Sequence, residues 1–364
     1  MYVDSLELMN YRNYNTLNIT FDKGTTILYG DNAQGKTNIL EAIYLSATTK
    51  SHRGSKDKEI IRFGDEEAHI RIHIIKHDVG HKIDLHLRKN KNKGVAIDGN
   101  KIKRSGELFG IMNIIFFSPE DLNLIKNGPS ERRRFIDLEL CQLNKLYHYN
   151  YMHYHKALGQ RNLLLKQIHN KSELIDTLDI WDYHLKEYGK NIIKFREEFI
   201  MMLNEIIKDI HGHLTGKKET LKVIYEKNVS LEDYDAILKN KRKLDLKYQT
   251  TQTGPHRDDI CFLINGIDTR KFGSQGQQRT AALSLKLAEI ELVKKIAKDN
   301  PVLLLDDVMS ELDNNRKQYL LKSIHDIQTI ITCTGYDDFM NKAKKNTFMV
   351  DAVYSVKEGQ VSKK

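Results

Sequence analysis

Apolar and polar positions divide the chain into regions of different period. Short apolar runs separated by polar turns lie at 6–8, 17–21 and 26–29, and strict alternation marks 69–74 and 82–87. Alternation of this kind is the period of a half-buried strand. A helical face follows Gly35, at residues 39, 40, 43 and 44. The pattern predicts strands on both sides of one helix within residues 1–104, with a basic hairpin tip at 88–94.

The middle of the chain has a helical period instead. No proline occurs from Ser130 to about His211, and apolar residues step by three or four at 136, 140, 143, 147, 151, 154 and 158. After a polar break at 170–172, a similar series occupies 180, 183, 185, 188, 192 and 195. This pattern predicts two long antiparallel helices, each on the order of 50 Å long. After His256 the pattern returns to strand, helix, strand and helix.

Proline commonly marks the ends of helices and strands, and the four prolines lie at the edges of these regions. They are Pro119, Pro129, Pro255 and Pro301. We therefore expect residues 1–117 to form the first half of an α/β lobe, 118–250 an inserted helical lobe, and 251–364 the second half of the α/β lobe. The polar tail after Tyr354 is expected to be frayed.

Composition and charge indicate where the protein is located and what kind of partner it suits. No run of eighteen apolar residues occurs, which excludes an ordinary transmembrane helix, and the N-terminus lacks a secretory signal, so we expect a cytoplasmic protein. The three cysteines, Cys141, Cys261 and Cys333, are too far apart to indicate a zinc site or a disulfide framework. Lysine and arginine number 58 against 49 acidic residues, a net charge of +9 that suits a polyanionic partner such as nucleic acid.

The most specific motif lies between the third apolar run and the first helix. It matches the phosphate-binding pattern G-x-x-x-x-G-K-[ST] through Gly30, Asp31, Asn32, Ala33, Gln34, Gly35, Lys36 and Thr37. The glycines let backbone N–H groups face phosphate, and the helix N-terminus favours the same anion. Lys36 is expected to reach the β- and γ-phosphates of ATP, and Thr37 to bind Mg²⁺. A glycine-rich turn with an incidental lysine is the plainer alternative.

A second motif, at 302–307, has four apolar residues followed by Asp306 and Asp307. This is typical of a buried parallel strand whose carboxyl end meets a ligand. Asp306 is expected to share the Mg²⁺ with Thr37, and Asp307 to act as a base or to orient the attacking water. A strand that ends in a solvated turn would look the same. About 270 residues separate the two motifs, so a lobe must be inserted between two halves of one nucleotide-binding core.

A third motif, residues 272–279, precedes a helix with an apolar face at 281, 282, 285, 288, 292 and 296. Ser274 suits the N-cap of this helix. Its hydroxyl and the N–H groups of the next turn would form a second anion site. A flexible loop that only caps the helix is the simpler interpretation.

These motifs resemble the ABC-type ATPase heads of the SMC and RecF class. Residues 274–278 resemble the signature loop of that class and residues 310–313 its D-loop. Further stretches that resemble the class lie at 10–14, 117–122, 128–137 and 253–259, so the resemblance spans almost the whole chain. It implies an α/β ABC-type ATPase head with antiparallel strands beside the P-loop lobe, and an inserted helical lobe with a short antiparallel helix pair.

The resemblance also implies a function. Heads of this class dimerise head to tail around two ATP molecules, so Ser274, Gly276 and Gln277 would act on ATP held by the other copy. Arg12 resembles an arginine that contacts the phosphates. RecF-type heads engage gapped or single-strand/double-strand-junction DNA, work with RecR and RecO-type mediator proteins, and help to load a recombinase. The expected activity is a weak DNA-stimulated ATPase with Lys36, Asp307 and Ser274 as catalytic residues.

Three positions depart from the class. Asp307 stands where many heads have glutamate, which is compatible with slow turnover. Residues 332–334 are Thr-Cys-Thr where a switch histidine is common, so γ-phosphate sensing would rest on a hydroxyl. Asn127 replaces an expected glycine in a turn.

Other functions stay open at this stage. A transporter ATPase subunit would normally carry a signature closer to LSGGQ, and a long-armed SMC clamp needs hundreds of heptad residues. A defence or signalling ATPase of the same superfamily with a fused nuclease would need a metal cluster outside the ATP motifs. The sequence indicates DNA contacts less specifically than ATP contacts, because each candidate residue could equally be a solvated surface charge. They are Lys50, His52, Arg53, Lys56, Lys58, Lys89, Lys91 and Lys93. Residues 132–134 could bind DNA, a partner or a helix end, and the role of 255–259 is open.

Overall fold

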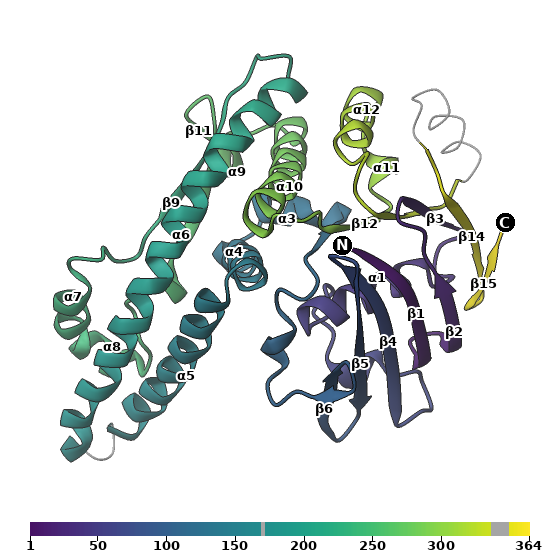
Figure 1. The fold of residues 1–364 in the computed structure, drawn as a ribbon. Coiled ribbons are helices and arrows are strands. Elements are labelled where there is room, and N and C mark those ends of the chain that lie inside the picture. The colour runs from purple at the N-terminus through teal and green to yellow at the C-terminus, as the bar shows by residue number, and fades with distance from the viewer. Residues whose placement is uncertain (169–171, 336–348) are drawn as a thin grey trace. The chain divides into compact units, whose positions relative to one another are not determined.

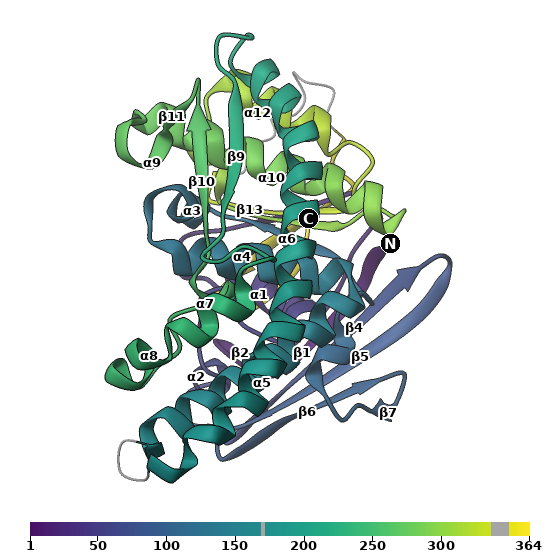
Figure 2. The same cartoon turned by 90° about the vertical axis from the view of Figure 1, so that its left-hand side faces the viewer.

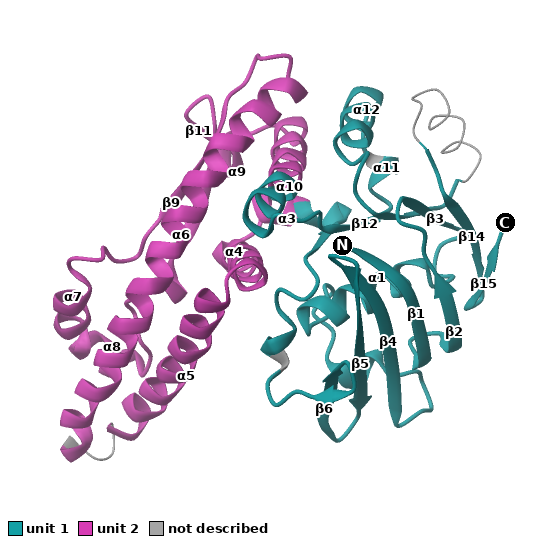
Figure 3. Cartoon of the chain, in the orientation of Figure 1, with its two compact units in different colours: residues 1–121, 289–364 teal, residues 122–288 magenta. Residues whose placement is uncertain are grey.

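The structure is a computed structural model that describes residues 1–168, 172–335 and 349–364 (Figure 1). The chain folds into two compact units (Figure 3). Unit 1 comprises residues 1–121 and 289–364, and unit 2 comprises residues 122–288. The expected boundary near 250 therefore differs from the observed division. Residues 251–288 join unit 2 because β10 (Asp259–Ile264) pairs with β9 (Leu221–Glu226) in one antiparallel sheet.

The first sheet of unit 1 is antiparallel and has the order β2-β1-β4-β5-β6-β7. Its strands are β1 (Tyr2–Tyr11), β2 (Tyr14–Thr20), β4 (Glu67–Lys76), β5 (Val79–Arg88), β6 (Lys91–Ile97) and β7 (Asn100–Lys101). The predicted alternation is confirmed in β4, where Ile70 and Ile72 are buried and the intervening Arg71 is exposed. One face of the sheet thus meets the core and the other meets solvent.

The second sheet of unit 1 has the order β15-β14-β3-β13-β12-β8. Its strands are β3 (Thr25–Tyr29), β8 (Ile114–Phe117), β12 (Val302–Asp306), β13 (Thr329–Cys333), β14 (Ala352–Lys357) and β15 (Gln360–Lys363). All neighbours except β14 and β15 are parallel. The apolar residues of β12 are buried, as expected for an inner parallel strand.

Helix α1 (Lys36–Thr48) forms the centre of unit 1. It begins after β3, is buried along most of its length, and contacts strands of both sheets. The carboxyl ends of β3, β12 and β13 consequently open toward the start of this helix, which is the usual ligand-binding edge of a parallel sheet. The other short elements of the unit are α2 (Asp57–Ile60), η1 (Ser105–Leu108), η2 (Pro119–Asp121), α11 (Val308–Glu311) and α12 (Asn314–Ser323).

The tail after Tyr354 is ordered into strands, so the prediction of a frayed end was wrong. β14 pairs with β3, and β15 folds back on β14 as a hairpin. Tyr354 and Val356 are buried on one face of β14. Two apolar side chains in a polar tail were enough to add a strand, because β3 offered an edge for pairing.

Unit 2 is mainly helical (Figure 2). Its helices are α3 (Leu122–Lys126), α4 (Pro129–Leu143), α5 (Lys145–Ile168), η3 (Ser172–Thr177), α6 (Leu178–Leu214), α7 (Tyr234–Asn240), α8 (Arg242–Tyr248), η4 (Pro255–Arg257), α9 (Thr269–Phe272) and α10 (Gln275–Ala297), of which the last crosses the boundary to unit 1. β11 (Ile267–Asp268) extends the β9–β10 sheet. No helix in the described part of the chain is long and apolar enough to cross a membrane.

The predicted pair of long antiparallel helices corresponds to α5 and α6. Asn150 contacts Asn191 and Arg161 contacts Asp182, so residue numbers rise along one helix as they fall along the other. The first predicted helix is in fact two, because the Asn144 side chain accepts hydrogen bonds from the N–H groups of the next turn and starts α5. The apolar period continues across this break and conceals it. Residues 170 and 171 of the predicted polar break lie outside the described residues.

A buried ionic group, here called the Arg196 cluster, joins the segments of unit 2. Arg196 on α6 donates to Asp137 at 2.6 Å, to Asp258 at 3.0 Å, to the Pro255 carbonyl at 2.7 Å and to Tyr147 at 3.2 Å. The Arg196 side chain is 3% exposed. The segment 255–259, whose role was open, is therefore held by the interior of the helical unit.

Candidate nucleotide-binding site

The phosphate-loop motif folds as a tight turn that only glycine can make at two points. Gly30 has φ 151° and Gly35 has φ 117°. A Cβ atom at Gly30 would lie 2.2 Å from the carbonyl oxygen of Val356, and one at Gly35 would lie 2.7 Å from the Tyr14 hydroxyl. Both glycines are required by conformation and by close approach of the neighbouring strands.

The first turn of α1 faces the loop with its backbone donors uncapped. Gly35 occupies the N-cap position, and among the described residues no side chain caps this turn and no acidic residue lies within it. The first N–H groups of a helix have no partner within the helix and carry its positive dipole end. The backbone therefore offers an anion site beside Lys36 and Thr37.

Lys36 lies inside the loop. Its Nζ atom donates to the carbonyl oxygens of Gly30 at 2.6 Å and Asp31 at 2.7 Å, and the residue is buried. Burial lowers the pKa of this amine, against the opposing effect of the negative charges of Asp307 and Asp306. A buried ammonium that is held by neutral carbonyls gains from an anionic ligand. Lys36 is thus placed to bind phosphate.

Asp306 lies at the end of β12 between two hydroxyl groups. Its Oδ1 atom accepts from Thr37 at 2.8 Å and from Thr332 at 2.8 Å. A carboxylate and a hydroxyl from opposite sides of one site are hard oxygen donors, which is the set that Mg²⁺ prefers. The Asp306–Thr37 contact therefore fits the predicted metal pair.

Asp307 follows in a left-handed conformation, with φ 53°. Its backbone N–H donates to the Thr332 hydroxyl at 3.0 Å, so that hydroxyl bridges the two consecutive aspartates. A non-glycine residue in this region of φ/ψ is held there by its surroundings. The Thr332 hydroxyl thus joins the acidic pair, and it is one of the two hydroxyls of residues 332–334 for which phosphate sensing was predicted.

Arg12 is anchored beside the site. Its guanidinium makes two hydrogen bonds of 2.7 Å to the Glu41 carboxylate, and further ones to Ser55 and to the Glu59 carbonyl. Burial alone would raise the pKa of Glu41, but the hydrogen bonds from Arg12 and Ser51 hold it below its usual value. The forked pair fixes the direction of Arg12.

A pocket of about 770 Å³ adjoins the start of α1. Its lining is rich in basic side chains and includes one exposed aromatic: Arg12, Asn13, Asn38, Arg53, Lys58, Glu59, Ile61, Arg62, Phe63, Gly64 and Lys89. Asn13 and Asn38 belong to the pocket and also lie at the phosphate loop, since Asn13 donates to the Gln34 carbonyl and accepts from Asn38. An anion bound at the loop could therefore extend into this pocket.

The loop is braced by residues that the sequence motifs did not reveal. Asn13 donates to the Gln34 carbonyl at 2.9 Å, and the backbone N–H groups of Glu358 and Gly359 contact the side chain and carbonyl of Gln34. These braces come from the β1–β2 turn and the C-terminal hairpin. The stretch at 10–14, which resembles the family, indicated the contact from Asn13. No local sequence pattern indicated the contact from the C-terminal hairpin.

The signature-like loop of unit 2 forms a reciprocal cap. The Ser274 hydroxyl accepts from the Gln277 N–H at 3.2 Å, and the Gln277 side chain accepts from the Ser274 N–H at 2.9 Å. Ser274 and Gly276 are exposed. The Gln277 amide also donates to Glu219 at 2.9 Å, and Glu219 lies 3.4 Å from the buried His211. Gln277 is therefore held within its own unit, while Ser274 and Gly276 face outward.

The predicted DNA contacts have mixed surroundings. Exposed positions are Lys50, Arg53, Lys56, Lys58 and Lys91, whereas Lys93 is bound to the Thr49 carbonyl and Asp57, Lys89 to Glu66, and His52 stacks on Phe116. Two of the three consecutive arginines at 132–134 make contacts within unit 2. Arg132 pairs with Asp259, and Arg133 donates to the Asp258 carbonyl. These two arginines serve the interior of unit 2.

Comparison with known proteins agrees with this geometry. The family described as RecF/RecN/SMC N terminal domain matches residues 2–359. The chain is 59% identical to the DNA replication and repair protein RecF of Lachnoclostridium phytofermentans over 100% of both chains, and 60% identical to that of Agathobacter rectalis over 99% of both.

Solved structures show the same fold. The structure of the recombination mediator protein RecF-ATP in RecFOR pathway superposes with a TM-score of 0.93 at 38% identity, covering 100% of this chain and 97% of the other. The Smc head domain of Pyrococcus furiosus, covering 100% and 96%, gives 0.58 at 18% identity, which shows the fold alone. The predicted α/β ABC-type ATPase head with an inserted helical lobe is confirmed, and the chain belongs to the RecF family of DNA replication and repair proteins.

Proposed function

We propose that this chain is an ATP-dependent DNA-binding protein of recombinational repair, whose ATP site is completed by a second copy. The observation that carries the proposal is the cluster of Lys36, Thr37 and Asp306 at the uncapped start of α1. A relative whose structure is described as RecF-ATP, with 38% identity over the whole chain, supports ATP as the ligand.

In this proposal the loop residues divide the work on ATP. Lys36 and the first N–H groups of α1 bind the β- and γ-phosphates, and Thr37 and Asp306 hold Mg²⁺. The metal ion would neutralise phosphate charge. Asp307, fixed through Thr332, orients the attacking water or accepts its proton. The sugar and base extend into the basic pocket, where the exposed Phe63 offers a stacking surface.

The second half of the site would come from the partner subunit. Ser274 and Gly276 are exposed at the N-terminus of α10, a helix of 23 residues whose dipole favours an anion. The reciprocal cap keeps the Ser274 hydroxyl at this end. We infer that the loop closes on the γ-phosphate held by the other copy, with Gln277 as a positioning residue and Arg12 as a further phosphate contact.

DNA would be engaged by the ATP-bound dimer. The net charge of +9 and the exposed Lys50, Lys56 and Lys91 supply contacts to the phosphate backbone. Gapped or single-strand/double-strand-junction DNA is the proposed substrate, RecR and RecO-type proteins are the proposed partners, and slow hydrolysis releases the dimer. The relative described as RecF-ATP is a recombination mediator in the RecFOR pathway, which supports this assignment.

The test is the mass of the protein in solution with and without ATP and Mg²⁺, for the wild type and Asp307→Asn. We expect ATP to produce a dimer, and the variant to keep the dimer for longer because hydrolysis is slowed. If neither protein dimerises, the composite site is refuted. ATPase rates with gapped DNA then test the DNA assignment, which fails if gapped, duplex and single-stranded DNA all leave the rate unchanged.

A further inference from the structure

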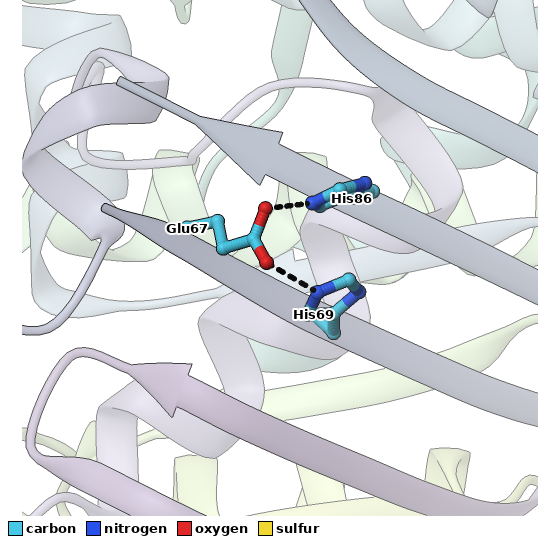
Figure 4. Close-up of side chains that lie close together, drawn as sticks. All are labelled: Glu67, His69 and His86. Carbon is cyan, nitrogen blue, oxygen red and sulfur yellow. Dashed lines mark hydrogen bonds and ion pairs between the residues drawn. The ribbon is translucent and has the colours of Figure 1, made fainter. Parts of the chain in front are cut away.

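Glu67, His69 and His86 form a cluster on the accessible face of the antiparallel sheet of unit 1 (Figure 4). His69 on β4 lies directly opposite His86 on β5, and Glu67 precedes His69 by two residues. Residues two apart on a strand point to the same face, so the register brings all three side chains together. Their ligand atoms lie within 4.8 Å of one another. None of these residues belongs to the nucleotide site.

The Glu67 carboxylate faces both histidines, as Figure 4 shows. One oxygen lies 2.7 Å from Nε2 of His86, and the other lies 3.7 Å from Nε2 of His69. The two imidazole rings stack with centroids 4.1 Å apart and an interplanar angle of 20°. The hydrogen bond from His86 lowers the pKa of the Glu67 carboxyl group.

A surface ion pair is the simplest account of this group, since both histidines lie within ion-pair distance of Glu67. The 2.7 Å contact is a hydrogen bond, whereas 3.7 Å is too long for one. A metal ion instead requires both imidazoles to be neutral, and it uses all three groups.

The donor set selects the kind of metal. Two imidazole nitrogens and one carboxylate oxygen suit Zn²⁺ and similar transition ions, whereas Mg²⁺ and Ca²⁺ prefer oxygen ligands alone. Bonds of about 2.0–2.2 Å in a tetrahedral zinc site place neighbouring ligand atoms about 3.3 Å apart. The observed contacts of 2.7 and 3.7 Å lie on either side of that value, and all three ligand atoms lie within 4.8 Å of one another.

We propose that Glu67, His69 and His86 bind one Zn²⁺ ion, with water at the fourth position. The ion would link β4 to β5 beside the short turn that leads to β6. Since Zn²⁺ would bind only the folded sheet, it would also raise the unfolding temperature of the protein.

The experiment is a calorimetric titration of tag-free full-length protein with ZnCl₂, without nucleotide and with excess Mg²⁺ to occupy all-oxygen sites. Wild type should bind one Zn²⁺, and His69→Ala/His86→Ala should bind it at least about tenfold more weakly. Glu67→Gln should weaken it as well. His73→Ala, which removes a histidine from the same face of β4, should bind as wild type does.

Two results would overturn the proposal. If wild type takes up no zinc, the cluster is an ion pair only. If the double histidine variant binds zinc as tightly as wild type, the metal lies elsewhere. Thermal unfolding gives an independent readout, because Zn²⁺ should raise the unfolding temperature of wild type and His73→Ala but not that of the double variant. All of these side chains are at least partly exposed, so the variants should fold.

Discussion

Charged residues play opposite parts in the phosphate loop of unit 1 and in the Arg196 cluster of unit 2. Lys36 is buried, and in the described part of the chain its ammonium group donates hydrogen bonds to neutral carbonyl oxygens, so its charge is available to a ligand. Arg196 is buried among the carboxylates of Asp137 and Asp258, which satisfy its charge within the protein. Burial alone therefore does not distinguish a charged group that binds a ligand from one that stabilises the fold. The groups that surround the charge distinguish the two cases.

The largest predicted effect is the loss of stability when the buried charge of Arg196 in unit 2 is removed. Arg196→Met should lower the free energy of unfolding by about 3–5 kcal/mol, because Asp137 and Asp258 would be left buried without their cation. Chemical denaturation measures this. Lys36→Met is the matched change in the loop, and it should alter the free energy of unfolding by less than about 1 kcal/mol while abolishing ATP binding. Equal destabilisation by the two variants would contradict the comparison.

A second prediction concerns His256, which unit 2 holds neutral. Its ring nitrogens contact the Tyr154 hydroxyl at 2.6 Å and the Thr251 carbonyl at 3.0 Å, and burial lowers its pKa to about 4. The unfolded chain binds the proton more readily, so stability should be full above about pH 6.5 and fall toward pH 4, by about 3 kcal/mol in total. Denaturation midpoints against pH check this, and His256→Gln should flatten that part of the profile. An unchanged slope would refute the assignment.

The third prediction concerns the hydroxyl that joins the two aspartates. Thr332→Val keeps the side-chain shape but removes the hydrogen bonds to Asp306 and Asp307. ATP hydrolysis should fall about 10–100-fold, since bonds to charged groups are worth about 1.5–3 kcal/mol. Thr16→Val, which changes an exposed threonine on β2, is the control and should be close to wild type in a steady-state ATPase assay. Similar rates for all three proteins would exclude Thr332 from the site.

The smallest predicted effect tests whether the signature loop needs its support. Glu219→Gln replaces the carboxylate that accepts from Gln277, while Ser274 itself is unchanged. ATP-dependent dimerisation should weaken about fivefold, equivalent to about 1 kcal/mol. Sedimentation at several protein concentrations measures this, with the exposed Glu232→Gln as control. A normal dimer in Glu219→Gln would show that the loop is ordered without this contact.

The sequence predicted those parts of the site that depend on local backbone. Gly30, Gly35 and Lys36 lie within one turn, so a single motif specified their arrangement. Asp306 was found because a buried apolar strand that ends in carboxylates is itself a local signal. Thr332, by contrast, reaches Asp306 through parallel pairing of β12 with β13, and Val356 reaches Gly30 through β14. Pairing between distant strands leaves no local pattern.

Prediction of the fold from the sequence was limited in a similar way. Alternation in β4 and β5 predicted both strands, because one face is buried and the other is accessible. The break at Asn144 was missed because the apolar spacing continues across it, and only the cap geometry separates α4 from α5. The boundary near 250 rested on Pro255, but the β9–β10 pairing keeps the following residues in unit 2.

We propose that one working ATP site takes Lys36 from one copy and Ser274 from the other. The most direct test mixes Lys36→Ala with Ser274→Arg and measures ATP hydrolysis. Each variant alone should be inactive, because every site in its homodimer lacks one half. A mixed dimer contains one complete site, so the mixture should hydrolyse ATP well above the sum of the separate rates. A mixture no more active than its components, although the two variants are shown to associate, would contradict the account.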